Sequence, residues 1–103
     1  MAQVRASKPT ERNPVYIVRL KREIREGLDK VGVGSAKVDF ERIQGTKLFR
    51  FRVIAAALSK LTHSERQDLV WRMVGRTLRD DEQIFISTIV TLTLSEASGR
   101  AAA

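Results

Sequence analysis

The sequence contains no cysteine in its 103 residues, and it has only one histidine, one tryptophan and two prolines. The lack of cysteine excludes disulfides, thiolate chemistry and cysteine-ligated metals. Because no disulfide can stabilise the fold, we expect the protein to reside in the reducing cytoplasm. No apolar run approaches the roughly 20 residues of a membrane-spanning helix, and the first 13 residues lack the apolar centre of a secretion signal. We therefore expect no contact with a membrane.

Basic residues outnumber acidic ones, and the formal net charge is +7. The hydrophobic share of 43% is normal for a globular chain, and the length suits one domain. A charge of this sign is by itself compatible with nucleic acid, an anionic membrane surface or acidic proteins as partners. It is equally compatible with a surface whose charges only keep the protein soluble.

We divide the chain into a flexible basic tail (1–13), a single domain (14–96) and a flexible tail of small residues (97–103). Asn13-Pro14 fits the N-cap and first position of a helix. Glycines that accept a left-handed conformation, Gly32 and Gly34, end this helix. Its apolar residues recur at helical spacing and predict one buried stripe, formed by Ile17, Leu20, Ile24, Leu28 and Val31.

Two alternating segments, Lys37–Ile43 and Lys47–Ala55, predict a hairpin with a two-residue turn at Gly45-Thr46. In that register, apolar residues oppose apolar ones on one face of the hairpin. On the other face acids oppose bases, with Glu41 opposite Arg50 and Asp39 opposite Arg52. Such cross-strand pairs favour this register over its neighbours.

The segment from Ala55 to Leu61 could extend the strand or begin a short helix. Either Thr62–Glu65 or Ser64–Gln67 fits a capping box that begins a second helix, which runs to about Arg79. A polar break follows, and then a β-branched strand from Ile84 to Leu94.

The order helix-strand-strand-helix-strand predicts an α+β fold. It is a two-layer α-β-β-α-β domain with a three-stranded mixed sheet and helices on one face. We expect the open face of the sheet to carry Asp39, Glu41, Arg50, Arg52, Ser87, Thr91 and Thr93.

The residues give no basis for catalysis, and we expect a protein that is not an enzyme. A lone histidine, His63, supports neither a catalytic triad nor a histidine metal cluster. It is either an exposed loop residue or a contact to one external group. We predict no metal site and no cofactor, because cysteine is absent and the histidine is single. For catalysis, no nucleophile, base and orienting group come together.

A protein partner is our preferred expectation. Trp71 falls at the border of the second helix's apolar face, where a tryptophan is either the rim of the core or an interface anchor. We assign partner contacts to Trp71, Arg72, Arg76 and His63. The alternative is a nucleic-acid binder that uses four basic residues of the first helix, namely Arg19, Lys21, Arg22 and Arg25. No aromatic row on the open sheet is available to stack bases.

Two stretches resemble the BolA-like proteins, small domains with a fold like the second class of KH domain. Trp71-Arg72-Met73-Val74, followed by Leu78, is similar to that family's helix motif of histidine, arginine, two apolar residues and a later leucine. The stretch 88–96 resembles its closing strand, which ends in threonine, leucine, threonine, proline and an acid. The resemblance covers roughly 16–96, and its motifs are short.

This resemblance implies an adaptor in stress or iron–sulfur regulation whose partner is a monothiol glutaredoxin, or a nucleic-acid-binding regulator. The family's cluster-ligating histidine falls at Trp71, and tryptophan cannot ligate iron. The family's second ligand has no counterpart around Gln44, Gly45 and Thr46. The resemblance therefore implies the fold and the partner without the cluster ligands.

Overall fold

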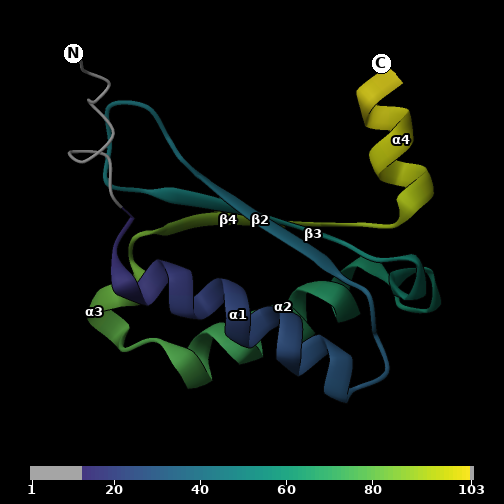
Figure 1. The fold of residues 1–103 in the computed structure, drawn as a ribbon, viewed down its shortest axis with the longest axis horizontal. Helices are drawn as coiled ribbons and strands as arrows, with labels where there is room; N and C mark the ends of the chain where they lie inside the picture. The colour runs from purple at the N-terminus through teal and green to yellow at the C-terminus, as the bar shows by residue number, and fades with distance from the viewer. Residues whose placement is uncertain (1–12, 103) are drawn as a thin grey trace, which may run out of the picture.

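The computed structural model describes residues 13–102 (Figure 1). Their elements follow in the order α1 (Val15–Lys30), β2 (Lys37–Arg42), β3 (Phe49–Ile54), the 3₁₀ helix η2 (Ala56–Lys60), α2 (His63–Thr77), α3 (Asp80–Gln83), β4 (Ile86–Leu92) and α4 (Leu94–Ala102). The sheet has the order β2-β3-β4, antiparallel between β2 and β3 and parallel between β3 and β4. The predicted α+β fold with a three-stranded mixed sheet is confirmed.

Helix α1 buries the predicted stripe against the sheet and α2. Ile17, Leu20, Ile24 and Leu28 are fully buried, whereas Val31 is exposed beyond the helix end. The start lies one residue later than expected, because Pro14 is the N-cap and Val15 is the first helical residue. Gly32 follows the helix with φ of +88°, the left-handed conformation that its lack of Cβ permits.

The hairpin has the predicted register. Asp39 pairs with Arg52, Phe40 with Phe51 and Glu41 with Arg50. Its turn differs from the expected one. The N–H of Ile43 donates to the carbonyl of Leu48, which leaves four residues in the loop, and Gly45 takes φ of +80° in a turn closed from Thr46 N–H to Ile43 O. The Thr46 hydroxyl also bridges the two ends of this loop, because it donates to Ile43 O at 2.8 Å and accepts from Leu48 N–H at 2.9 Å.

The segment after β3 turns into η2, which resolves the ambiguity of residues 55–61 in favour of a short helix. Helix α2 then begins with the first of the two candidate capping boxes. Thr62 Oγ1 accepts from Glu65 N–H at 3.1 Å, and Glu65 Oε1 accepts from Thr62 N–H at 2.8 Å. Four of its residues are buried, namely Arg66, Val70, Met73 and Val74. The expected polar break contains the single turn α3.

Strand β4 is shorter than predicted and its faces differ from the prediction. A register irregularity at Phe49 and Arg50 lets Phe49 pair with Ile86 but Arg50 pair with Thr88. Ser87 and Thr88 are consequently both exposed, and the alternation beyond them is reversed. Thr91 and Thr93, expected on the open face, are 1% and 8% exposed. That part of the prediction is wrong because the bulge changes which residues face the helices.

The chain after β4 does not continue as the expected strand and tail. Residues 94–102 form helix α4, so the predicted tail of 97–103 is helical as far as Ala102. The predicted basic tail lies outside the described residues except for Asn13. Figure 1 shows α1, α2 and α3 on one face of the sheet and α4 rising on the other side from the end of β4.

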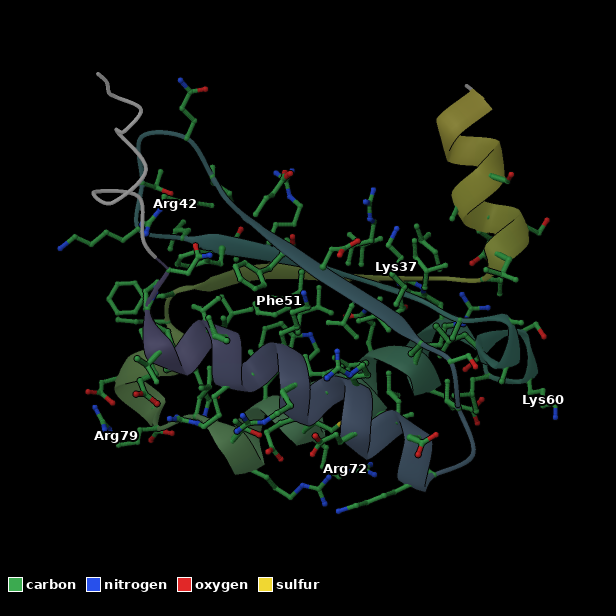
Figure 2. All side chains as sticks on the ribbon, in the orientation of Figure 1. Lys37, Arg42, Phe51, Lys60, Arg72 and Arg79 are labelled. Carbon is green, nitrogen blue, oxygen red and sulfur yellow. The ribbon has the colours of Figure 1, made fainter. Side chains whose placement is uncertain are left out.

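Phenylalanines of β3 fill the centre of the core between the sheet and the helices. Phe49, Phe51 and Val53 are fully buried there, as Figure 2 shows for Phe51. Phe40 of β2 packs against both phenylalanine rings of β3, with centroids 6.0 and 5.5 Å away. Such aromatic packing adds to the stabilisation that burial alone provides.

Candidate functional site

A groove lies where the start of α2, the free edge of β4 and the start of α4 meet. Its volume is about 470 Å³. We call it the edge groove and define it by its lining residues, His63, Arg66, Val90, Thr91, Leu92, Glu96 and Gly99. The groove therefore combines one histidine, one ion pair, one hydroxyl and an apolar portion.

Arg66 is the central polar group of the edge groove, and it is only 8% exposed. Its Nε donates to the carbonyls of Leu58 at 3.0 Å and Leu61 at 3.2 Å. Its Nη1 donates to the carbonyl of Thr91 at 3.5 Å and to Glu96 Oε1 at 2.9 Å. One side chain thus ties η2, β4 and α4 to α2. A buried guanidinium requires such partners because an uncompensated buried charge is strongly destabilising.

Glu96 has two roles at the beginning of α4. Its Oε1 accepts from Thr93 N–H at 2.8 Å, while its own N–H donates to Thr93 Oγ1 at 3.1 Å, which completes a capping box. The same Oε1 accepts from Arg66. The Thr93 N–H and, next, the Arg66 guanidinium lower the pKa of the Glu96 carboxyl below its ordinary value. The carboxylate is therefore the stable form at neutral pH.

Gln67 of α2 bonds to the edge of β4 and also holds the indole of Trp71. Gln67 Nε2 donates to the carbonyl of Ile89 at 2.9 Å and approaches Thr91 Oγ1 at 3.4 Å. Its Oε1 accepts from Trp71 Nε1 at 3.1 Å. The Trp71 indole is half-buried and packs at the rim of the core. His63, Gln67 and Trp71 therefore follow one stripe of α2 at a spacing of four residues.

The four predicted partner-binding residues do not form one surface. His63 lines the edge groove, and Trp71 lies two helical turns farther along the same stripe. Arg72 and Arg76 are exposed on another side of α2, and Figure 2 shows Arg72 on the side of the helices away from the sheet. Arg76 lines a separate groove of about 370 Å³ between α1 and α2, together with Glu23 and Glu26.

The basic residues of α1 also point to different surroundings. Arg19 Nη2 donates to Thr77 O at 3.3 Å and lies 3.6 Å from Glu82 Oε1. The Lys21 ammonium lies 5.9 Å from the centroid of the Phe40 ring. Arg22 and Arg25 are exposed. Arg19 and Lys21 therefore contact other elements of the fold, whereas Arg22 and Arg25 face solvent, with Arg22 Nε 4.0 Å from Glu23 Oε2.

The open face of the sheet carries the predicted ladder of opposite charges. Arg50 Nη1 lies 2.9 Å from Glu41 Oε2, and Arg52 Nη2 lies 3.7 Å from Asp39 Oδ2. These four side chains remain partly exposed, so each pair contributes little to stability. Opposite charges alternate on this face, and the Asp39 carboxylate is shared with Lys37, whose Nζ lies 4.0 Å from Oδ2.

Sequence reasoning missed Arg66, Gln67 and Glu96 as site residues, although signals for them were present. Thr93 and Glu96 have capping-box spacing, but they follow a β-branched run. Arg66 precedes the buried Val70 by four residues and therefore lies on the buried stripe. The four-residue spacing of Gln67 and Trp71 suits a side-chain hydrogen bond on a helix.

The residues that the structure describes contain no group of three or more histidine or acidic side chains placed to hold a metal ion. None of the described helices is both long and apolar enough to cross a membrane. Comparison of the sequence with protein-family models and with curated proteins finds no match.

Proposed function

We propose that the protein is a non-enzymatic binding module that holds a protein partner along the edge groove and the adjoining stripe of α2. The observation that carries this proposal is the fixed arrangement of exposed and half-buried side chains over the β4 edge. Gln67 orients the Trp71 indole, and Arg66 holds the groove together through four hydrogen bonds. A rigid, partly exposed aromatic beside a groove is typical of interface anchors.

The distribution of positive charge favours a protein over nucleic acid as the partner. Arg50 and Arg52 face carboxylates on the open sheet, and Arg19 contacts Thr77 and Glu82. These contacts lower the number of arginines free to neutralise phosphates, which dominate affinity for nucleic acid. Among the described residues that line the edge groove, the buried arginine faces a carboxylate, so these two charges balance.

The resemblance to BolA-like proteins supplies a specific partner to test, a monothiol glutaredoxin. In this proposal the protein binds the glutaredoxin through Trp71 and His63, without ligating the iron–sulfur cluster. It would then act in iron–sulfur or stress regulation as an adaptor. Tryptophan at the position of the family's ligand gives a flat apolar contact where a metal bond would otherwise form.

The test compares Trp71→Ala with Arg72→Ala in the immobilised full-length protein. Both residues lie on α2, but of the two only Trp71 bonds to Gln67, whose amide in turn bonds to the carbonyl of Ile89 in β4. Binding of a monothiol glutaredoxin is measured first, followed by capture from lysate of the source organism with and without nuclease. We expect Trp71→Ala to weaken binding at least tenfold and Arg72→Ala to have little effect. Melting curves establish that both variants are folded.

The opposite result, loss with Arg72→Ala alone, would place the partner on the far side of α2 and refute the edge surface. Unfolding of Trp71→Ala would assign the ring to the core; His63→Ala, at an exposed position, then tests the same surface. Capture that disappears with nuclease would favour nucleic acid over a protein partner.

A nucleic-acid function is the second candidate because Arg22 and Arg25 are exposed on α1. It predicts binding of random RNA or DNA that weakens linearly with the logarithm of salt concentration. The variant Arg22→Gln/Arg25→Gln should reduce both the affinity and this slope. No detectable binding at about 50 mM salt, where counterion release strongly favours association, would exclude it.

A further inference from the structure

We infer that the Arg66–Glu96 ion pair is a latch that fixes α4 as one wall of the edge groove, so that its release opens the groove. The latch would regulate the proposed binding surface, and in this respect the inference rests on the proposed binding function. The latch itself can be tested without any partner.

Helix α4 needs an external fixing point. Figure 1 shows it rising away from the layer of the other helices, and it has only nine residues. Isolated helices of this length are marginal in water, because nucleation is costly and few hydrogen bonds follow it. The exposed Leu94 provides little burial at its start. The contacts of Glu96 therefore matter more here than they would in a long, packed helix.

The two partners of the latch differ in accessibility. The Arg66 side chain is 9% exposed and is held by three carbonyls besides Glu96, whereas the Glu96 side chain is 47% exposed. Glu96 can therefore leave from the solvent side while Arg66 remains in place. Arg66 thus stays fixed between α2, η2 and β4, whereas Glu96 can move away together with α4.

The groups around Glu96 favour the intact ion pair, with α4 held against the edge groove, at neutral pH. Among the described residues that line the edge groove, Glu96 supplies the sole carboxylate, and the other titratable groups are Arg66 and His63 of α2. Lys60, at the end of η2, is exposed. A carboxylate that accepts a hydrogen bond from a buried guanidinium is stabilised in its charged form. Either protonation or a competing carboxylate would therefore release α4.

Hydrogen exchange of the α4 amides, residues 97–102, tests the latch in the full-length protein. Glu96→Gln removes the charge but retains an oxygen acceptor, and we expect these amides to exchange roughly tenfold or more faster, because a charged hydrogen bond is replaced by a neutral one. Thr93→Val removes the hydroxyl of the cap but leaves the ion pair, so its effect should be smaller. Asp68→Asn removes an exposed carboxylate of α2 and should leave α4 unchanged.

A double-mutant cycle with Arg66→Met separates the pair from two independent effects. If the pair is the latch, the double variant exchanges no faster in α4 than the faster single variant. The inference would be overturned if the increases in exchange rate of the two single variants multiply in the double variant, or if Glu96→Gln leaves the exchange of α4 unchanged. Neither result depends on Trp71, so failure of the latch and failure of the proposed function remain distinguishable.

Discussion

Replacement of Arg66 by methionine should destabilise the protein substantially, although Arg66 is a charged residue of a helix. The change retains most of the buried aliphatic volume but removes every hydrogen bond of the guanidinium. Leu58 O keeps a second bond from Leu61 N–H, whereas Leu61 O and Thr91 O lose the arginine donor. Each buried acceptor left unsatisfied costs about 1–3 kcal/mol. Loss of the hydrogen bond to Glu96 costs less free energy, because water can hydrate that carboxylate.

We therefore expect Arg66→Met to lower the free energy of unfolding by about 2–4 kcal/mol. For a domain of this size each kcal/mol corresponds to roughly 4–8 °C in melting temperature. Urea unfolding followed by circular dichroism measures the change directly. The matched control is Arg72→Met on the exposed side of the same helix, which should stay within about 0.5 kcal/mol of the wild type. Equal effects of the two changes would refute the structural role of Arg66.

Three other predictions follow from local geometry. Thr62→Ala removes the acceptor of the α2 capping box and should cost about 1 kcal/mol in urea unfolding. Gly75→Ala should stabilise α2 by up to about 1 kcal/mol, since an added Cβ meets nothing within 4 Å. Gly32→Ala should instead destabilise the protein, because the φ of Gly32 is +88°. Changes of the same sign in the free energy of unfolding would contradict the backbone argument. The pKa of Glu96 is lowered in the fold, first by Thr93 N–H and then by Arg66, so its stabilisation is complete above the unfolded pKa of about 4.3 and is lost as pH falls through the lower folded value. NMR titration of the Glu96 carboxyl carbon should show this depression, with a partial return in Arg66→Met, and an ordinary value in the wild type would refute it.

The hairpin could be predicted because the apolar pairs and the charged pairs of its two strands independently indicate the same register. A register that opposes Phe40 to Phe51 also opposes Glu41 to Arg50, and a shift by one residue would destroy both sets of pairs. Strand β4 offers no such test. Both of its alternating sets contain apolar or threonine side chains, so the sequence of β4 does not reveal which set faces the helices. The bulge opposite Phe49 and Arg50 decides this in three dimensions.

The edge groove was harder to predict because its main side chains form hydrogen bonds with backbone carbonyls of other elements. Polar side chains of a helix such as Arg66 and Gln67 normally lie in solvent, and nothing in the sequence of α2 sets these two apart. In the structure they bond to the carbonyls of Thr91 and Ile89, which are distant in sequence. Pattern analysis follows the periodicity of one element and does not show which carbonyls of another element lack a partner. Glu96 was missed for the same reason, since its partner Arg66 lies 30 residues earlier.

These backbone contacts determine how a partner can approach. A free sheet edge normally offers carbonyl and N–H groups to an added strand, a mode of recognition with little dependence on side chains. At β4, Gln67 and Arg66 already bond the carbonyls of Ile89 and Thr91. A partner on this side therefore meets side chains, namely the Trp71 indole, His63 and the Arg66–Glu96 pair. Recognition at this surface should depend on the partner's sequence, and extension of the sheet by another strand is disfavoured there.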